Sequence, residues 1–296
     1  MKLRQDRVIG CLLGMAIGDA LGMPFTGFTA QEIDGLGLRG SEYRSKLFED
    51  GTNLKAGEFT DESEGALCIV ESFTANTGSL DIENIRARLH ILARGESHRW
   101  MAESTLTHLR HLDENDTYAD LDESDVGSDI AIRGVPLGLI HAGRDSYEPD
   151  LLFADARTLA EVTHPGDVAA ASIARVAELV RSLSLGESKA RRDLGRYERW
   201  VDDASSIGRL IDDAYQAYVD SVSFSDAVDR ASRSGGSTDG RGALTGAFAG
   251  AALGTSGIPQ GLIDGLEGRV YIMLAGPWFY QSIKLRGAFA GGPGAK

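Results

Sequence analysis

Cysteine is scarce in this sequence: Cys11 and Cys68 are its only two, and both lie inside apolar helical patterns. Two isolated cysteines provide neither a disulfide framework nor the spacing of a zinc site, which suits a reducing compartment. Long apolar runs are missing too, because Gly14, Gly18 and Asp19 interrupt the first such stretch and no small-residue cleavage site follows it. With no run near about 20 apolar residues, no membrane-spanning helix is expected. We expect a cytoplasmic protein.

Basic charge is also in short supply. The chain has 30 Lys and Arg against 44 Asp and Glu, a formal net charge of -14. Binding to nucleic acid or to anionic lipid depends mainly on Lys and Arg meeting phosphate, so neither partner is expected. A small phosphorylated ligand stays compatible, because helix N-termini or a single Arg can hold it locally.

Strict alternation of apolar and polar residues never extends beyond a few positions, which argues against half-buried strands. Apolar residues instead recur at helical spacing in residues 81–95, 166–183 and 205–222. Asp81 is placed to cap the first of these helices and Gly95 to end it. The sequence therefore predicts an all-α fold of many short-to-medium helices.

Two segments break the helical pattern without marking a domain boundary. Residues 113–129 carry eight acids and no Lys or Arg, and an EF-hand glycine is missing, so a solvated acidic loop is expected. Residues 186–203 mix both charges, as in an exposed helix or connection. We expect a single domain over residues 1–290 and a flexible tail over 291–296.

Glycine and alanine recur three or four residues apart in residues 10–24 and 242–259. Gly disfavours a helix by about 1 kcal/mol, so something must compensate for it there. Close packing of two central helices is the simplest account. A phosphate-binding loop is not supported, because no Gly-x-x-x-x-Gly-Lys-Ser/Thr pattern is present.

Six segments, in order along the chain, resemble motifs of the ADP-ribosylglycohydrolase family: residues 10–27, 59–67, 128–139, 163–172, 234–254 and 258–275. The first resembles its Gly-Asp-Ala-Leu-Gly opening and the second its Thr-Asp-Asp-Thr motif. The third is similar to Gly-Asn-Gly-Ala-x-x-Arg-x-x-Pro-Leu-Gly, and the fifth to a Gly-Gly-Asp-Thr-Asp-Thr helix start. The resemblance implies a compact, multi-helix, all-α ADP-ribosylglycohydrolase-like fold, in agreement with the periodicity.

The resemblance also implies a chemistry. In the family, the two acidic motifs lie at helix N-termini, face each other across a cleft and hold two Mg²⁺ or Mn²⁺ ions. Such ions bind carboxylate and other oxygen ligands and usually keep some water. They can fix ribose hydroxyls and orient a water at the anomeric carbon, where an oxocarbenium-like state develops.

Residue by residue, the first acidic motif is largely retained. Thr60 and Asp61 match, Glu62 replaces the second Asp with a longer carboxylate, and Ser63 stands for the following Thr. In the third segment Arg133 and Pro136 remain. Asp129 takes the place of the expected Asn.

The second acidic motif is depleted. Asp239 matches, but Ser237 stands where the first Asp is expected and Gly240 where a ligand Thr is expected. Thr26 stands where many members carry a glutamate that assists catalysis. We therefore expect one Mg²⁺ or Mn²⁺ ion rather than two, or none.

The resemblance implies roles for ten residues. Asp61, Glu62 and Asp239 are expected to be catalytic, with Asp239 or Glu62 as the general base. Thr60, Asp61, Glu62 and Asp239 are the expected metal ligands. The expected substrate-binding residues are Asp19, Asp129, Arg133, His164, Ser237 and Thr238.

Structural interpretations of the same residues remain open. Asp61 and Glu64 fit a capping box, and acids in a first turn complement the helix dipole. Ser237 and Thr238 can cap the helix that follows them. His164 precedes a proline at a helix start, which suits a structural role as well as a catalytic one.

Arg133 can meet a diphosphate or pair with Asp129, four residues earlier. The sequence thus favours a glycosidase that hydrolyses the N-glycosidic bond of an ADP-ribosyl or related NAD- or nucleotide-derived compound. Its partner would be a small nucleotide or an ADP-ribosylated substrate. The alternative is a non-catalytic relative that binds ADP-ribose or a partner, because the losses at positions 26, 237 and 240 fall on functional positions.

Overall fold

The computed structural model describes residues 2–115, 117–118, 122, 125–187, 195–201 and 205–290. The expected tail, 291–296, lies outside them, as do parts of the two irregular segments. The described chain is helical apart from one short antiparallel hairpin, in which β1 (Lys46–Leu47) pairs with β2 (Asn53–Leu54). The all-α prediction is confirmed.

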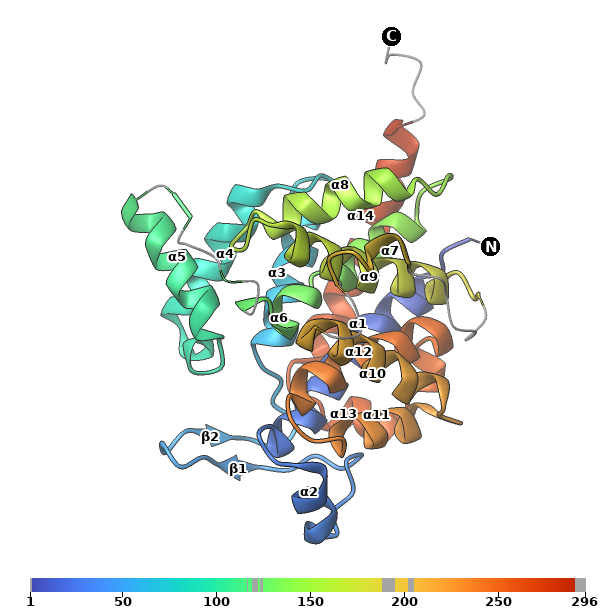
Figure 1. Ribbon diagram of the computed structural model, residues 1–296. Helices are drawn as coiled ribbons and strands as arrows, with labels where there is room; N and C mark the ends of the chain where they lie inside the picture. Colours follow the sequence, from blue (N-terminus) through green and yellow to red (C-terminus); the bar gives the residue numbers. More distant parts are fainter. Residues whose placement is uncertain are drawn as a thin grey trace.

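The helices surround a central pair, and their bounds follow in chain order (Figure 1). They are α1 (Gln5–Gly22), η1 (Met23–Phe25), α2 (Ala30–Leu36), α3 (Asp61–Ala75), α4 (Ile82–Arg94), η2 (Glu96–Arg99), α5 (Glu103–Asn115), α6 (Ser128–Ala131), α7 (Gly134–Ala142), α8 (Pro149–Ala160), α9 (Asp167–Ser184), η4 (Gly195–Tyr197), α10 (Ser206–Val219), α11 (Phe224–Ser232), α12 (Thr238–Leu253), η5 (Thr255–Gly257), α13 (Gln260–Gly265) and α14 (Arg269–Ala290).

The central pair is α1 and α12, and glycine is what lets the two backbones touch. A Cβ on Gly14 would lie 2.2 Å from the carbonyl oxygen of Gly246, and a Cβ on Gly18 would lie 1.9 Å from that of Gly242. Gly22 stands in the same relation to the start of α12, at 2.0 Å from the Thr238 carbonyl oxygen. The prediction of two closely packed glycine-rich helices is confirmed. Their contact brings the end of α1 to the beginning of α12.

Among the residues that the structure describes, one segment, residues 5–25, is long and apolar enough to cross a membrane by length and composition, contrary to the sequence expectation. Its mean hydropathy is 1.7, and 94% of the tested window is buried inside the protein. A core helix passes the same test. Its burial between the surrounding helices identifies α1 as such a core helix.

The expected helix boundaries recur in the structure. Asp81 accepts a hydrogen bond from the Asn84 N–H at 3.0 Å, and Gly95 follows the last residue of α4. Helix α10 is capped in the same way by the Ser205 hydroxyl. Local sequence signals therefore set the ends of these outer helices.

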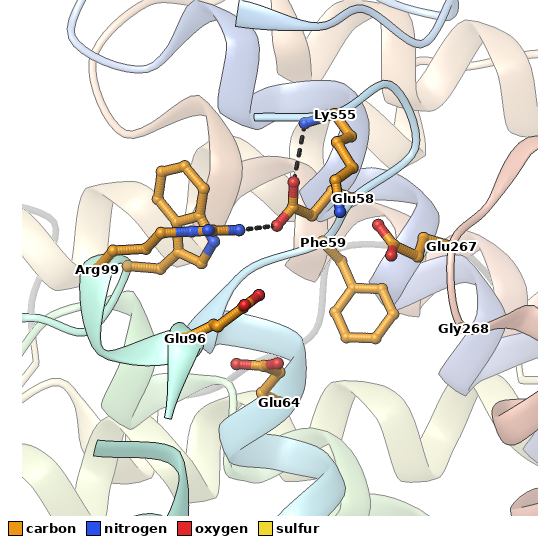
Figure 2. Close-up of a pocket in the computed structure, with 9 residues that line it drawn as sticks. Lys55, Glu58, Phe59, Glu64, Glu96, Arg99, Glu267 and Gly268 are labelled. Atoms are coloured by element: carbon orange, nitrogen blue, oxygen red, sulfur yellow. Dashed lines mark hydrogen bonds and ion pairs between the residues drawn. The ribbon is translucent and has the colours of Figure 1, made fainter. Parts of the chain in front are cut away.

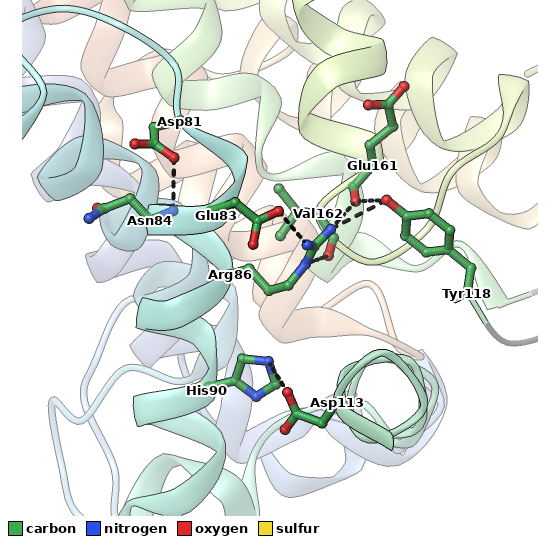
Figure 3. A network of polar contacts seen from close by, with 9 residues as sticks. All are labelled: Asp81, Glu83, Asn84, Arg86, His90, Asp113, Tyr118, Glu161 and Val162. Atoms are coloured by element: carbon green, nitrogen blue, oxygen red, sulfur yellow. Dashed lines mark hydrogen bonds and ion pairs between the residues drawn. The ribbon is translucent and has the colours of Figure 1, made fainter. Parts of the chain in front are cut away.

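Arg86 of α4 forms hydrogen bonds with the backbone that follows α8 (Figure 3). Its guanidinium donates to the carbonyl oxygens of Glu161 and Val162 at 2.9 and 3.1 Å, and to a carboxylate oxygen of Glu83 at 2.7 Å. The Tyr118 hydroxyl donates to the same Glu161 carbonyl at 2.6 Å. Cationic donors suit the unsatisfied carbonyls after a helix C-terminus. This clamp fixes the segment that leads to His164.

Candidate active site

Asp19 of α1 caps the start of α3 from a distant part of the chain. Its Oδ2 accepts hydrogen bonds from the backbone N–H groups of Thr60 and Ser63 at 3.0 and 3.2 Å and from the Ser63 hydroxyl at 2.6 Å. Its Oδ1 accepts from the Thr60 hydroxyl at 2.8 Å. Asp19 is fully buried, and burial raises its pKa to about 7 although these bonds oppose the rise.

The prediction that Asp61 and Glu64 form a capping box is wrong. Asp61 is the first residue of α3, after the N-cap Thr60, and the α3 N-cap makes no side-chain cap bond. Asp19 satisfies the donors that a local cap would have met. The carboxylates of Asp61 and Glu62 are therefore not used to cap α3.

Glu62 is almost completely buried and only half satisfied. The Ser128 hydroxyl of α6 donates to its Oε1 at 2.5 Å. Its Oε2 is buried and has no hydrogen-bond partner among the described residues. A buried carboxylate oxygen without a partner is costly unless a proton, a ligand or a cation reaches it.

Five carboxylates form what we call the acidic cluster: Asp19, Asp61, Glu62, Asp129 and Asp239. Burial raises the pKa of Asp61 well above its usual value, and the charges of Asp129, Asp19 and Asp239 raise it further. Burial likewise raises the pKa of Glu62, with Asp61, Asp239 and Asp129 adding to it. The structure therefore brings these acids together from α1, α3, α6 and α12.

Asp129 has its own partners at the edge of the cluster. The Thr105 hydroxyl donates to its Oδ2 at 2.6 Å. Burial raises the pKa of Asp129, while this bond and the charge of Arg133 lower it. Thr105 lies on α5, so the cluster is supported from a fifth helix.

Helix α12 begins differently from α3. Ser237 is its N-cap residue but makes no side-chain cap bond, and its hydroxyl instead donates to Asp239 Oδ1 at 3.2 Å. The Asp239 N–H donates to the Thr26 hydroxyl at 3.2 Å. The Thr238 hydroxyl donates to the Gly22 carbonyl at 2.9 Å. The expectation that Ser237 and Thr238 cap α12 is wrong, because Thr26 takes that role.

Gly240 faces Ser128 at close range. A Cβ on Gly240 would lie 2.2 Å from the Ser128 hydroxyl oxygen, 2.3 Å from Ser128 Cβ and 3.2 Å from Glu62 Oε1. Ser128 therefore occupies the space that a larger residue at position 240 would need. Counting back from Arg133 also places Ser128, rather than Asp129, opposite the Asn of the family motif.

The donor chemistry of the cluster suits a hard divalent cation. Asp61, Glu62 and Asp239 supply carboxylate oxygens, one of which is the unpartnered Glu62 Oε2. Thr60 donates its hydroxyl proton to Asp19, which leaves the oxygen lone pairs. Within the described ranges, no three His, Cys, Asp or Glu side chains converge as a ready metal site.

Arg133 and His164 lie buried behind the cluster. Arg133 donates to the Leu159 carbonyl at 3.0 Å and to the Thr163 hydroxyl at 2.7 Å, and burial lowers its pKa to about 10. These bonds replace the expected direct pairing with Asp129, whose charge still acts on Arg133. His164 is 1% exposed and contacts Thr163 through Nδ1 at 2.9 Å.

Burial lowers the pKa of His164 to about 3, and the charge of Arg133 lowers it further. The imidazole is therefore neutral at physiological pH, and its ring meets that of His108 edge-on with centroids 4.3 Å apart. Among the described residues, no carboxylate forms a hydrogen bond with the His164 ring, unlike the usual catalytic histidine. A structural role for His164 accounts for these contacts.

Sequence reasoning missed Ser128 and Thr105, which hold two acids of the cluster. Ser128 follows a glycine at a helix start, a pattern that marks a capping serine and could have singled it out. Thr105 lies within an amphipathic helix with no local signal. Its contact with Asp129 depends on tertiary packing alone.

A pocket of about 240 Å³ opens beside the first turn of α3 (Figure 2). Phe59, which directly precedes Thr60, lines it together with Glu64, Arg99 and Trp100. Arg99 forms an ion pair with Glu58, and its guanidinium lies 4.9 Å from the Trp100 ring centroid. None of the residues that line this pocket belongs to the acidic cluster, and the two share only the first turn of α3.

Known proteins share this chain's sequence and fold along almost its whole length. The ADP-ribosylglycohydrolase family model matches residues 1–288. The ADP-ribosyl-dinitrogen reductase glycohydrolase of Rhodospirillum rubrum is 26% identical over 278 residues, which cover 90% of this chain and 92% of that protein. The ADP-ribosylarginine hydrolase Tri1 of Serratia proteamaculans is 27% identical over 313 residues, covering 94% and 80%.

A solved structure agrees in fold. The chain described as an ADP-ribosylglycohydrolase-related protein complex superimposes with a TM-score of 0.78 at 24% identity, and the match covers 96% of this chain and 100% of that one. The relatives named as glycohydrolases and the family model point to hydrolysis of the same type. This chain belongs to the ADP-ribosylglycohydrolase family.

Proposed function

We propose that this protein hydrolyses the N-glycosidic bond of an ADP-ribosyl compound, or of a related compound derived from NAD or a nucleotide. One Mg²⁺ or Mn²⁺ ion would be held by Asp61, Glu62 and Asp239, with the Thr60 hydroxyl oxygen beside them. When bound, such an ion orients ribose hydroxyls and a water.

One observation carries this proposal: Asp19 caps α3, so the acids of its first turn are free of capping. The charge of Asp239 raises the pKa of both Asp61 and Glu62, and the charge of Asp61 raises that of Glu62 as well. This repulsion between carboxylates does not stabilise the fold, and it is relieved when a cation or a developing positive charge arrives.

In this proposal, the residues of the acidic cluster and Ser128 have separate roles. Glu62 Oε2, which has no partner in the described structure, is the atom that would accept a proton from the attacking water. Ser128 holds the other oxygen of Glu62 in place. Negative charge on Asp61 and Asp239 would stabilise the oxocarbenium-like state at the anomeric carbon.

A second candidate is a relative that binds ADP-ribose without hydrolysing it. It is favoured by the start of α12, where Ser237 has a hydroxyl in place of a carboxylate, Gly240 has no side chain, and Ser128 fills the space beside Gly240. Binding and turnover therefore have to be measured separately.

The test is calorimetric titration of metal-stripped protein with Mn²⁺, with and without ADP-ribose, followed by assays for ADP-ribose release from ADP-ribosylated arginine and from NAD-derived compounds. Asp61→Asn and Asp239→Asn remove one carboxylate each. Asp167→Asn is the matched control, because Asp167 is the first residue of α9 and lies outside the cluster.

We expect Mn²⁺ binding and turnover in the wild-type protein and in Asp167→Asn, and loss of both in the two cluster variants. ADP-ribose binding without turnover of any substrate would favour the second candidate. Turnover that survives in Asp61→Asn and Asp239→Asn would contradict the assignment of these acids.

A further inference from the structure

Lys46, the first residue of β1, holds its ammonium group against two aromatic rings. Its Nζ lies 4.4 Å from the ring centroid of Phe28 and 4.6 Å from that of Phe48. The Phe48 ring in turn meets the Trp100 ring edge-on at 5.7 Å. Cation–π contacts fix an ammonium group in place without neutralising its charge.

Backbone hydrogen bonds join the Phe28 segment to the residues just before α12. The Phe28 carbonyl accepts a hydrogen bond from the Gly236 N–H at 2.8 Å, and the Gly27 N–H donates to the Gly236 carbonyl at 3.0 Å. Gly236 lies three residues before Asp239. The charge of Asp239 acts on Lys46. Lys46 therefore stands at the edge of the acidic cluster.

Two other cations act on members of the cluster, and both are committed elsewhere. Arg133 donates to a backbone carbonyl and a threonine hydroxyl. Arg241 donates to a serine hydroxyl and to a backbone carbonyl. By contrast, no hydrogen bond or ion pair engages the Lys46 ammonium within the described part of the chain. A half-buried ammonium held in this way is ready to bind an anion.

We propose that Lys46 is the anion anchor of the site, whose ammonium binds a phosphate oxygen of the substrate while Phe28 and Phe48 hold it in position. The inference rests on the proposed function, because an ADP-ribosyl substrate carries a diphosphate. A cluster of carboxylates repels a diphosphate, and a fixed ammonium at its edge offsets that repulsion. Lysine binds phosphate as a point charge and needs no bidentate geometry.

The test measures binding of ADP-ribose, inorganic pyrophosphate and adenosine to the wild-type protein, Lys46→Met and Lys46→Arg. Lys284→Met is the matched control, because the Lys284 ammonium also lies over an aromatic ring, that of Tyr280, but on α14 and outside the acidic cluster. In Lys46→Met we expect affinity for ADP-ribose and pyrophosphate to fall about tenfold or more. Adenosine affinity should not change, since adenosine has no phosphate.

Lys46→Arg should retain most of the phosphate affinity, and Lys284→Met all of it. With a hydrolysed substrate, Lys46→Met should raise KM more than it lowers kcat. If Lys46 were merely structural, Lys46→Met would weaken the binding of adenosine and of ADP-ribose equally, and that result would overturn the proposal. Unchanged phosphate affinity with tighter Mn²⁺ binding would make Lys46 only a counter-ion of Asp239 and would overturn it too.

The anchor and the proposed hydrolysis can fail separately. Pyrophosphate binding that depends on Lys46, in a protein that hydrolyses no ADP-ribosyl compound, would uphold the anchor alone. A wild-type protein that binds neither ADP-ribose nor pyrophosphate would overturn the anchor. Turnover that is insensitive to Lys46→Met in both KM and kcat would uphold the hydrolysis and reject the anchor.

Discussion

The starts of α3 and α12 both carry acids of the same cluster, yet they are built in different ways. Helix α3 begins in the interior, where a buried carboxylate from another helix, Asp19, takes its donors. Helix α12 begins half-buried, where a hydroxyl from a neighbouring turn, Thr26, accepts one N–H. The first start is fully determined by tertiary structure, and the second has weaker support.

The same two helix starts also differ in how they compare with the family motifs that they resemble. The α3 start keeps both of its carboxylates, whereas the α12 start keeps Asp239 but has Ser237 and Gly240 in place of an acid and a threonine. Ser128 fills the space left beside Gly240.

The largest effect is expected from Asp19→Ala. It leaves two buried N–H groups and two hydroxyls at the α3 start without their acceptor, so the free energy of unfolding should fall by at least about 3 kcal/mol. Denaturant unfolding monitored by circular dichroism measures it. Asp19→Asn is the control, since one amide oxygen can replace Oδ2 and the amide N–H can donate to the Thr60 hydroxyl oxygen. An equal loss in Asp19→Asn would mean that charge, not capping, is what α3 requires.

Gly240→Ala should destabilise the protein by about 1–3 kcal/mol, because its Cβ would lie 2.2 Å from the Ser128 hydroxyl oxygen and 2.3 Å from Ser128 Cβ. Adding Ser128→Gly should recover much of that loss, as a double-mutant cycle of unfolding free energies would reveal. Gly65→Ala is the matched control on α3. It has open space around its Cβ and should be neutral or stabilising. Strictly additive effects of Gly240→Ala and Ser128→Gly would refute the steric coupling.

Periodicity and small-residue spacing were enough to predict the all-α fold and the α1–α12 contact. Those features follow from local rules: a helix buries one face, and glycines at regular spacing let two backbones meet. The Asp81 cap of α4 was also predicted, since the capping side chain adjoins the helix in sequence. The resemblance to the family added which acids would lie near one another.

The details of the site could not be predicted from the sequence, because they depend on contacts between residues far apart along the chain. Asp19 and Thr60 are 41 residues apart, so the true cap of α3 has no local signature. A neighbouring Asp61 therefore suggested a capping box that the structure lacks. The contacts of Ser128 with Glu62 and of Lys46 with Phe28 likewise join separate segments, and only packing brings them together.

The acidic cluster also predicts a pH dependence of stability. The folded pKa of Asp19 is raised from 3.8 to about 7, so the folded protein keeps a proton that the unfolded chain releases. Between those values the unfolding free energy should fall as pH rises, and acidification through that window should stabilise the protein. The Tm should therefore be a few degrees lower at about pH 8 than at about pH 5.5. Asp19→Asn should flatten this slope, and an unchanged slope in that variant would exclude Asp19 as its source.

The smallest effect is expected at the α12 start, from Thr26→Val. This change keeps the side-chain volume but removes the hydroxyl that accepts from the Asp239 N–H, at an expected loss of about 1 kcal/mol of unfolding free energy. Water can replace the lost acceptor because Thr26 is half-buried, which is not possible at Asp19. Ser205→Ala, which removes the ordinary local cap of α10, provides the reference value. A loss in Thr26→Val as large as that in Asp19→Ala would mean that both helix starts depend equally on distant caps, and the contrast between them would be lost.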